Sequence, residues 1–137
     1  MKEEEIILES DIPVICIVAD SFPDGVMDAH KKLHSRIPFS PDRRYFSLSW
    51  HKEGGGLHYQ AAAEILDPKE ADIEDGVSFA IRKGKYSSII IHDFMNNIPA
   101  IAEAFDQLLK NENMDPNGYG LEWYLSREDV RCMVPLI

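Results

Sequence analysis

Apolar and polar residues follow a definite order along the first half of the chain. A short β-branched run at residues 13–19 predicts a buried strand, which the turn-forming residues at 20–25 bring to an end. From residue 26 to 37 apolar side chains recur every three or four positions, which predicts an amphipathic helix that stops before Pro38. Alternation at 46–50 and 57–65, on either side of a run of three glycines, then predicts a hairpin.

The second half of the chain repeats this order after a charged linker. Its helix has the cleaner apolar stripe, and Asn97 and Pro99 are residues that favour the start of a helix. The predicted elements are strands at 77–81 and 86–92, a helix at 98–109, and a hairpin formed by 121–125 and 130–137.

The two halves therefore predict an α+β fold of duplicated β-α-β-β units within a single domain over residues 1–137. Repeat one covers about 6–66 and repeat two about 77–137. We expect an antiparallel sheet with two helices on one face. One helix protects only one side of its own strands, so we also expect a ligand groove between the repeats on the uncovered face.

Charge and composition narrow the possible partners. The 137 residues hold 24 acidic and 14 basic side chains, a net charge of −10 that repels nucleic acid and anionic lipid surfaces. No apolar run approaches the roughly 20 residues of a membrane helix, and no signal peptide is recognisable, so we expect a cytoplasmic protein. Cys16 and Cys132 are both surrounded by apolar residues, which predicts two buried thiols.

Several segments resemble the GyrI-like small-molecule-binding domain, a duplicated fold of the SHS2 type, and the resemblance covers nearly the whole chain. The segments are Ile81-Arg82-Lys83-Gly84-Lys85-Tyr86, Gly120-Leu121-Glu122-Trp123-Tyr124-Leu125, Val130-Arg131-Cys132-Met133-Val134-Pro135-Leu136, Ser47-Leu48-Ser49-Trp50 and Leu57-His58-Tyr59-Gln60-Ala61. The family includes the DNA gyrase inhibitor, effector-binding domains of AraC-type and MerR-type regulators, and stand-alone copies, some of them hydrolases. No helix-turn-helix segment precedes the domain here, so a role in transcription would need a separate partner.

The resemblance implies an aromatic-walled pocket between the repeats with a glutamate at its base. The family's acid precedes a tyrosine by two residues in the penultimate strand, and Glu122 and Tyr124 occupy those positions. Where the family often has a tyrosine in the first repeat, this chain has Trp50.

Strand alternation gives a prediction for the orientation of these residues. If Leu121, Trp123 and Leu125 pack under the helices, Glu122 and Tyr124 face the groove. The repeat correspondence would add Leu48 and Trp50 to that face. We also take Tyr59 as a pocket candidate, expect Trp123 to belong to the core, and leave Tyr86 unassigned.

Other motifs carry weaker signals. His30 and His34 are four residues apart on the first predicted helix, but no third metal ligand is evident, so we interpret them as a solvated pair. The run Gly54-Gly55-Gly56 lacks the lysine and helix of a phosphate-binding loop, so it reads as a hairpin turn. We expect no metal and no cofactor.

Three functions follow from these observations. The favoured one is a stand-alone effector-binding or multidrug-binding module that holds a hydrophobic, possibly cationic molecule against Glu122, with cation–π contacts from aromatic rings. The alternative is a small hydrolase that uses Glu122 as general acid or base and Tyr124 as a second donor. A third is an acidic domain that modulates a basic protein partner such as DNA gyrase. The sequence favours binding over catalysis.

Overall fold

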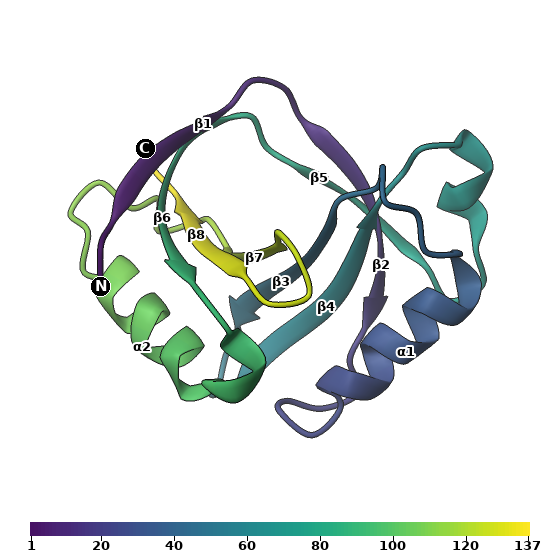
Figure 1. Ribbon diagram of the computed structural model, residues 1–137, viewed down its shortest axis with the longest axis horizontal. Coiled ribbons are helices and arrows are strands. Elements are labelled where there is room, and N and C mark those ends of the chain that lie inside the picture. Colours follow the sequence, from purple (N-terminus) through teal and green to yellow (C-terminus); the bar gives the residue numbers. More distant parts are fainter. The chain divides into compact units, whose positions relative to one another are not determined.

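The computed structural model describes residues 1–137, which form an α+β fold of antiparallel strands and two α-helices (Figure 1). The strands are β1 (Glu4–Leu8), β2 (Ile12–Val18), β3 (Tyr45–His51), β4 (Leu57–Glu64), β5 (Val77–Ile81), β6 (Gly84–Ile91), β7 (Gly120–Tyr124) and β8 (Val130–Pro135). The helices are α1 (Val26–Arg36) and α2 (Pro99–Leu108), with 3-10 turns η1 (Pro68–Asp72) and η2 (Phe94–Asn96). No helix is long and apolar enough to cross a membrane.

The chain divides into two compact units. The first unit comprises residues 1–10 and 82–137, and the second comprises residues 11–81.

The second unit is a four-stranded antiparallel sheet in the order β5-β2-β4-β3. The helix α1 packs on β2 and β4, where Ala29, Leu33 and Ile37 are buried. They contact Ile15 and Ile17 of β2 and small alanines of β4. The small alanines of β4 leave room for Leu33 and Ile37, while Ile15 and Ile17 of β2 fill the space beside Ala29.

The first unit has the same arrangement, in the order β1-β6-β8-β7 (Figure 1). The helix α2 packs on β6 and β8 through Ala100, Ala104 and Leu108, one residue per helical turn. The sheet supplies the apolar side chains of Ile89, Ile91, Val130, Cys132 and Val134.

The predicted duplication is present in the topology. Each unit contains a strand, a helix and a hairpin in that order, and the hairpin's second strand pairs with the first strand in both. The sequence missed β1, whose first residues are glutamates and whose apolar residues are too few to form a clear pattern. It also placed the strand at 77–81 with the second repeat, whereas β5 pairs with β2, as β1 pairs with β6.

Two local predictions have clear physical explanations. The three glycines between β3 and β4 all have φ between 81° and 105°, a region that L-residues rarely adopt, so they serve as a hairpin turn. The helix α2 starts with Pro99 at its first turn, as expected, although Ile98 rather than Asn97 is the cap.

A partly buried ion pair attaches η1 to the second unit's hairpin. The guanidinium of Arg43 binds both carboxylate oxygens of Glu70, at 2.7 and 2.8 Å, and donates a further bond to the carbonyl of Glu64. The same carboxylate accepts hydrogen bonds from the backbone N–H groups of Leu66 and Asp67. These bonds fix the segment between β4 and β5.

Both cysteines are buried and unpaired, which confirms the prediction of two buried thiols. Burial raises the pKa of Cys16 to about 12. Neither thiol is therefore ionised near neutral pH, and neither is an activated nucleophile.

Candidate functional site

The ladder between β7 and β8 fixes the orientation of Glu122 and Tyr124. Glu122 lies opposite Cys132, and Tyr124 lies opposite Val130. Both partners belong to the core under α2, and directly opposite residues share a face of the sheet. Glu122 and Tyr124 therefore point to the side of the sheet that carries α2.

This corrects the expectation that Leu121, Trp123 and Leu125 pack under the helix. Leu121 and Trp123 lie opposite Met133 and Arg131, on the face away from α2, and Leu125 follows the strand and is exposed. The sequence pattern identified the two faces of β7 correctly, and Leu121 and Trp123 do share one. It assigned the helix to the wrong face, because alternation alone does not tell which apolar face meets a helix.

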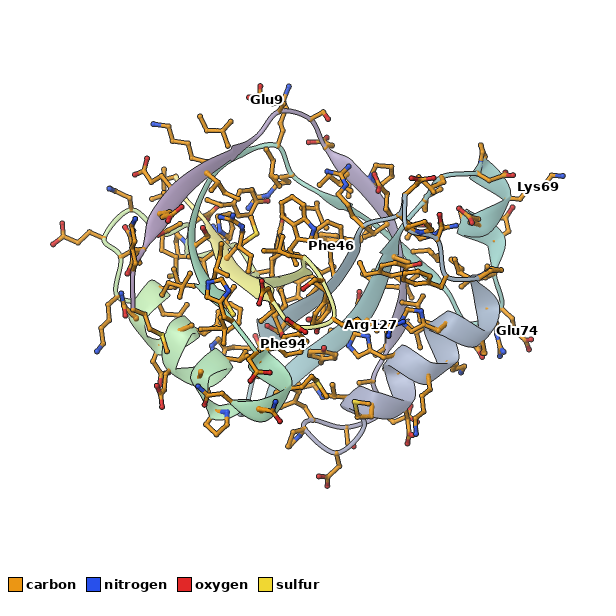
Figure 2. The ribbon with its side chains drawn as sticks, viewed as in Figure 1. Glu9, Phe46, Lys69, Glu74, Phe94 and Arg127 are labelled. Carbon is orange, nitrogen blue, oxygen red and sulfur yellow. The ribbon has the colours of Figure 1, made fainter.

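Aromatic and hydrogen-bonding contacts hold Tyr124 in place. The ring centroid of Tyr124 lies 5.8 Å from that of Phe94, which is labelled in Figure 2. Tyr124 also packs against the core under α2. Its hydroxyl donates a hydrogen bond to Oε1 of Glu122 at 3.3 Å. Phe94 is positioned in turn by its backbone N–H, which donates to the carbonyl of Glu128 in the β7–β8 turn. Glu122 and Tyr124 thus form a connected pair on one strand.

The helix α2 has a polar flank and an apolar flank on either side of its buried stripe. Gln107 marks the β1 side, because its amide bonds to the carbonyl of Met1 and the carboxylate of Glu3. Successive residues of an α-helix point about 100° apart, so the other flank of α2, across the buried stripe from Gln107, faces β7. All the side chains of this flank are apolar. It consists of Ile98, Ile101, Phe105 and Leu109.

The second unit separates residues that the sequence placed together. Leu48 and Trp50 lie opposite Gln60 and His58, on the face away from α1, and Leu48 is completely buried. Tyr59 lies on the face of α1. The expectation that the repeat correspondence puts Leu48 and Trp50 on the same face as Glu122 and Tyr124 is therefore wrong, because Glu122 and Tyr124 lie on the helix face of their own unit.

The error is a shift of one residue between the repeats. In both hairpins the tryptophan is the penultimate residue of the first strand, and it lies opposite the second residue of the next, so Trp50 corresponds to Trp123. By the same count Ser49, and not Trp50, corresponds to Glu122. A shift of one residue moves every side chain to the other face of the sheet.

The structure also reveals a pair that the sequence did not identify. Nε2 of His30 and the hydroxyl of Tyr59 share a hydrogen bond of 2.8 Å, with the ring of Phe22 5.6 Å from that of Tyr59. Burial, together with the nearby charge of His34, lowers the pKa of His30 to about 4, so this imidazole is neutral at pH 7. The interpretation of His30 as solvated is thus wrong. A sequence signal was available, since His30 lies three positions before Leu33 and seven before Ile37, which is the spacing of the apolar side of this helix.

The two histidines of α1 do not form a metal site with other ligands. His30 is bonded to Tyr59, while the ring of His34 lies 5.3 Å from that of Tyr45. No group of three or more potential metal ligands occurs in the chain. Tyr86, which the sequence left unassigned, is buried and bonded through its hydroxyl to Tyr119 and to the carbonyl of Arg82.

The arrangement around Glu122 suits ion pairing or proton transfer. A carboxylate lies beside aromatic and aliphatic side chains, and it accepts a hydrogen bond from a phenol. Such a group can neutralise a cation that is itself apolar, or it can exchange a proton with a bound molecule.

Solved structures of several proteins resemble this chain over nearly its full length. An integron cassette protein from Vibrio cholerae, VCH_CASS2, has a TM-score of 0.69 at 12% identity, covering 98% of this chain and 95% of that one. SAV2435, solved with tetraphenylphosphonium bound, has a TM-score of 0.63 at 10% identity, with coverages of 100% and 94%. A hydrolase from Listeria innocua has a TM-score of 0.57 at 11% identity, with coverages of 99% and 92%.

At these identities the similarity establishes the fold alone. No protein-family model and no curated protein matches the sequence. The structural similarities agree with the fold expected from the GyrI-like resemblance, and they include a protein that binds a small cationic molecule.

Proposed function

We propose that this protein binds a small hydrophobic cation and that Glu122 supplies the opposing charge. The observation that carries the proposal is the position of this carboxylate on the α2 face of β7, opposite Cys132 and beside Tyr124. An acid next to an apolar core is costly to keep charged unless a cation or a hydrogen-bond donor compensates it.

The surroundings of Glu122 match the ligand class. Phe94 and Tyr124 present aromatic rings, and the flank of α2 toward β7 presents only apolar side chains. Both features favour binding of a delocalised organic cation, because aromatic faces attract its positive charge and apolar side chains bury its hydrocarbon surface. The tetraphenylphosphonium bound to SAV2435, a protein of the same fold, belongs to this class.

We propose that Tyr59 contacts a ligand within the second unit, taken by itself. His30 fixes the orientation of its hydroxyl, and the neighbouring ring of Phe22 is 43% exposed. Leu48 is completely buried and enters no part of this proposal. Trp50 lies on the other face of the sheet and enters no part of this proposal.

A thermal-shift screen combined with mass spectrometry tests the proposal. The thermal unfolding of wild type and Glu122→Gln is measured with tetraphenylphosphonium, with neutral hydrophobic drugs and with strained electrophiles. The mass of every recovered compound is then determined by mass spectrometry. We expect tetraphenylphosphonium to stabilise wild type but not Glu122→Gln, and to be recovered unchanged. Equal stabilisation of both proteins would refute the role of Glu122.

The Tyr124–Glu122 hydrogen bond favours one second candidate, a hydrolase. A phenol bonded to a carboxylate can serve as an acid while the carboxylate activates water, and a hydrolase is among the proteins of this fold. This candidate predicts that an electrophile is converted by wild type and recovered unchanged from Glu122→Gln. If neither protein responds to any compound, a protein partner becomes the better hypothesis, with salt-dependent association that does not depend on Glu122.

A further inference from the structure

A partly buried arginine lies on the face of the first unit's sheet that α2 does not cover. Arg131 is opposite Trp123 on β7 and opposite Ile90 on β6, and both neighbours therefore share its face. Its Nη1 donates to the hydroxyl of Ser88 at 3.0 Å. Its Nε is buried and has no hydrogen-bond partner.

No carboxylate compensates this guanidinium. Three other arginines are paired with acids, since Arg43, Arg44 and Arg82 bind carboxylates at 2.7, 2.6 and 3.2 Å. On the face of Arg131 the four strands carry one acid, Glu4, whose carboxylate is 3.6 Å from Lys2. In a chain with 24 acidic residues, an unpaired arginine in this position is unusual.

The chemistry of the guanidinium indicates what would pair with it. Because Nη1 is engaged by Ser88, the edge formed by Nε and Nη2 remains, and two parallel N–H groups on one edge match the two oxygens of a carboxylate. A half-buried cation without an opposite charge is also costly, so an anion that binds there relieves this cost.

The neighbouring side chains define the rest of the ligand. Trp123 and Ile90 share this face, are apolar and are partly exposed, whereas Met133 between the strands is completely buried. The indole of Trp123 offers a flat surface on which an aromatic ring can stack. The site thus combines an anion-binding edge with an apolar, aromatic border.

We propose that Arg131, with Ser88 and Trp123, forms a second ligand site that takes a small aromatic carboxylate. It differs from the Glu122 site in both place and charge, because Glu122 lies on the α2 face and Arg131 on the opposite face of the same sheet. The inference stands independently of the proposed binding of cations.

The position in the second unit that corresponds to Arg131 is occupied by His58, whose polar side chain does have a partner. There Trp50 lies opposite His58, as Trp123 lies opposite Arg131. The ring of His58 is bonded through Nε2 to the amide of Gln60 at 2.9 Å, and its ring centroid is 5.6 Å from that of Trp50. His58 thus has a hydrogen-bond partner and an aromatic neighbour in the second unit, whereas Arg131 in the first unit is hydrogen-bonded only to the hydroxyl of Ser88.

Nuclear magnetic resonance titration with sodium benzoate tests the proposal directly. Benzamide serves as the neutral probe of the same shape, and the side-chain N–H signals of Arg131 and Trp123 are the readout. Arg127→Gln is the matched control variant, because it removes the same charge from the exposed β7–β8 turn, where Arg127 is labelled in Figure 2.

We expect benzoate, but not benzamide, to shift both signals in a saturable manner. Affinity should fall about tenfold or more in Arg131→Gln and stay within about twofold of wild type in Arg127→Gln. Arg131→Lys keeps the charge but loses the paired N–H groups, so it should bind more weakly than wild type, and it provides a test if Arg131→Gln does not fold.

Two results would overturn the inference. One is the absence of any saturable shift of the Arg131 and Trp123 signals in wild type, which needs no variant. The other is equal loss of benzoate affinity in Arg131→Gln and Arg127→Gln, which would mean that only overall charge matters. Benzoate binding should persist in Glu122→Gln, so failure at one site is distinguishable from failure at the other.

Discussion

Glu122 and Cys132 lie directly opposite each other in the β7–β8 ladder, and the carboxylate affects the ionisation of the thiol. Burial is the main cause that raises the pKa of the Cys132 thiol, and the negative charge of Glu122 raises it further. The carboxylate thus lies close enough to the core under α2 to affect a buried atom there. This is the basis for treating Glu122 as part of a ligand site rather than as a solvated strand residue.

The hydroxyl of Tyr124 separates the binding hypothesis from the catalytic one. Tyr124→Phe keeps the ring against Phe94 but removes the hydrogen bond to Glu122. If the site only binds cations, the affinity for tetraphenylphosphonium should change by less than about threefold, because this ligand accepts no hydrogen bond. Isothermal titration calorimetry provides the measurement.

Tyr124→Ala is the informative companion variant. It removes the ring as well, so it should weaken cation binding by about tenfold. Equal affinities of the Ala and Phe variants would show that the ring makes no contact with the cation. A hydrolase would instead lose turnover already in Tyr124→Phe.

His30 should make the stability of the protein fall in mildly acidic solution. Its pKa is lowered to about 4 in the folded state, against an ordinary value of 6.5, so between these values the unfolded chain binds the proton more readily. Its contribution to stability is therefore complete above about pH 6.5 and is lost as the pH falls toward 4. From the size of the shift, the total loss is on the order of 3 kcal/mol.

Urea denaturation of wild type and His30→Phe at pH 4 to 7 measures this effect. The variant lacks the titrating imidazole, so its free energy of unfolding should decline less than that of wild type over this range. His51→Gln is the control, since His51 is exposed at the end of β3. Parallel declines in wild type and His30→Phe would contradict the assignment of a buried, neutral His30.

Glu70 should be important for the second unit's stability through its ion pair with Arg43. Its side chain is 19% exposed, that of Arg43 is 7% exposed, and the hydrogen bonds from Arg43 lower the pKa of Glu70 to about 2. Glu70→Gln leaves the guanidinium without its counter-charge and should cost about 3 kcal/mol.

The free energy of unfolding of Glu70→Gln and Asp72→Asn, measured by chemical denaturation, checks this. Asp72 is exposed on the same turn, η1, so its loss should cost less than about 0.5 kcal/mol. Because the pKa of Glu70 is lowered, its contribution is present above about pH 4.5 and is lost as the pH falls through 2. A cost for Glu70→Gln no larger than for Asp72→Asn would show that the pair is not stabilising.

The elements of the fold were predictable because their patterns are local. The stripe that ends in Leu108 and the alternation of β3 and β4 are visible within short windows of sequence, and the triple glycine marks the turn between them. The strand β1 was not predictable, because it begins with glutamates and has too few apolar residues to form a recognisable alternation. The pairing of β5 with β2 depends on contacts with a distant part of the chain, which no local pattern contains.

The candidate site was predictable in part. Resemblance to a family pointed to Glu122 and Tyr124, and the structure places both on one face and joins them by a hydrogen bond. Whether Glu122 and Tyr124 share a face with α2 depends on how this helix packs on the sheet, which the strand pattern does not contain. Which residue of the second repeat corresponds to Trp50 depends on the exact register of the strands. The bond between His30 and Tyr59 joins residues 29 positions apart, so only the folded structure reveals it.

A calorimetric titration of tetraphenylphosphonium into wild type, Glu122→Gln and Glu128→Gln measures directly whether the carboxylate of Glu122 binds the cation. Glu128 is an exposed acid in the β7–β8 turn, so the two variants lose the same charge at neighbouring places. The account predicts that Glu122→Gln weakens binding about tenfold or more, while Glu128→Gln stays within about twofold of wild type. Equal affinities of all three proteins, or no binding to wild type, would contradict it.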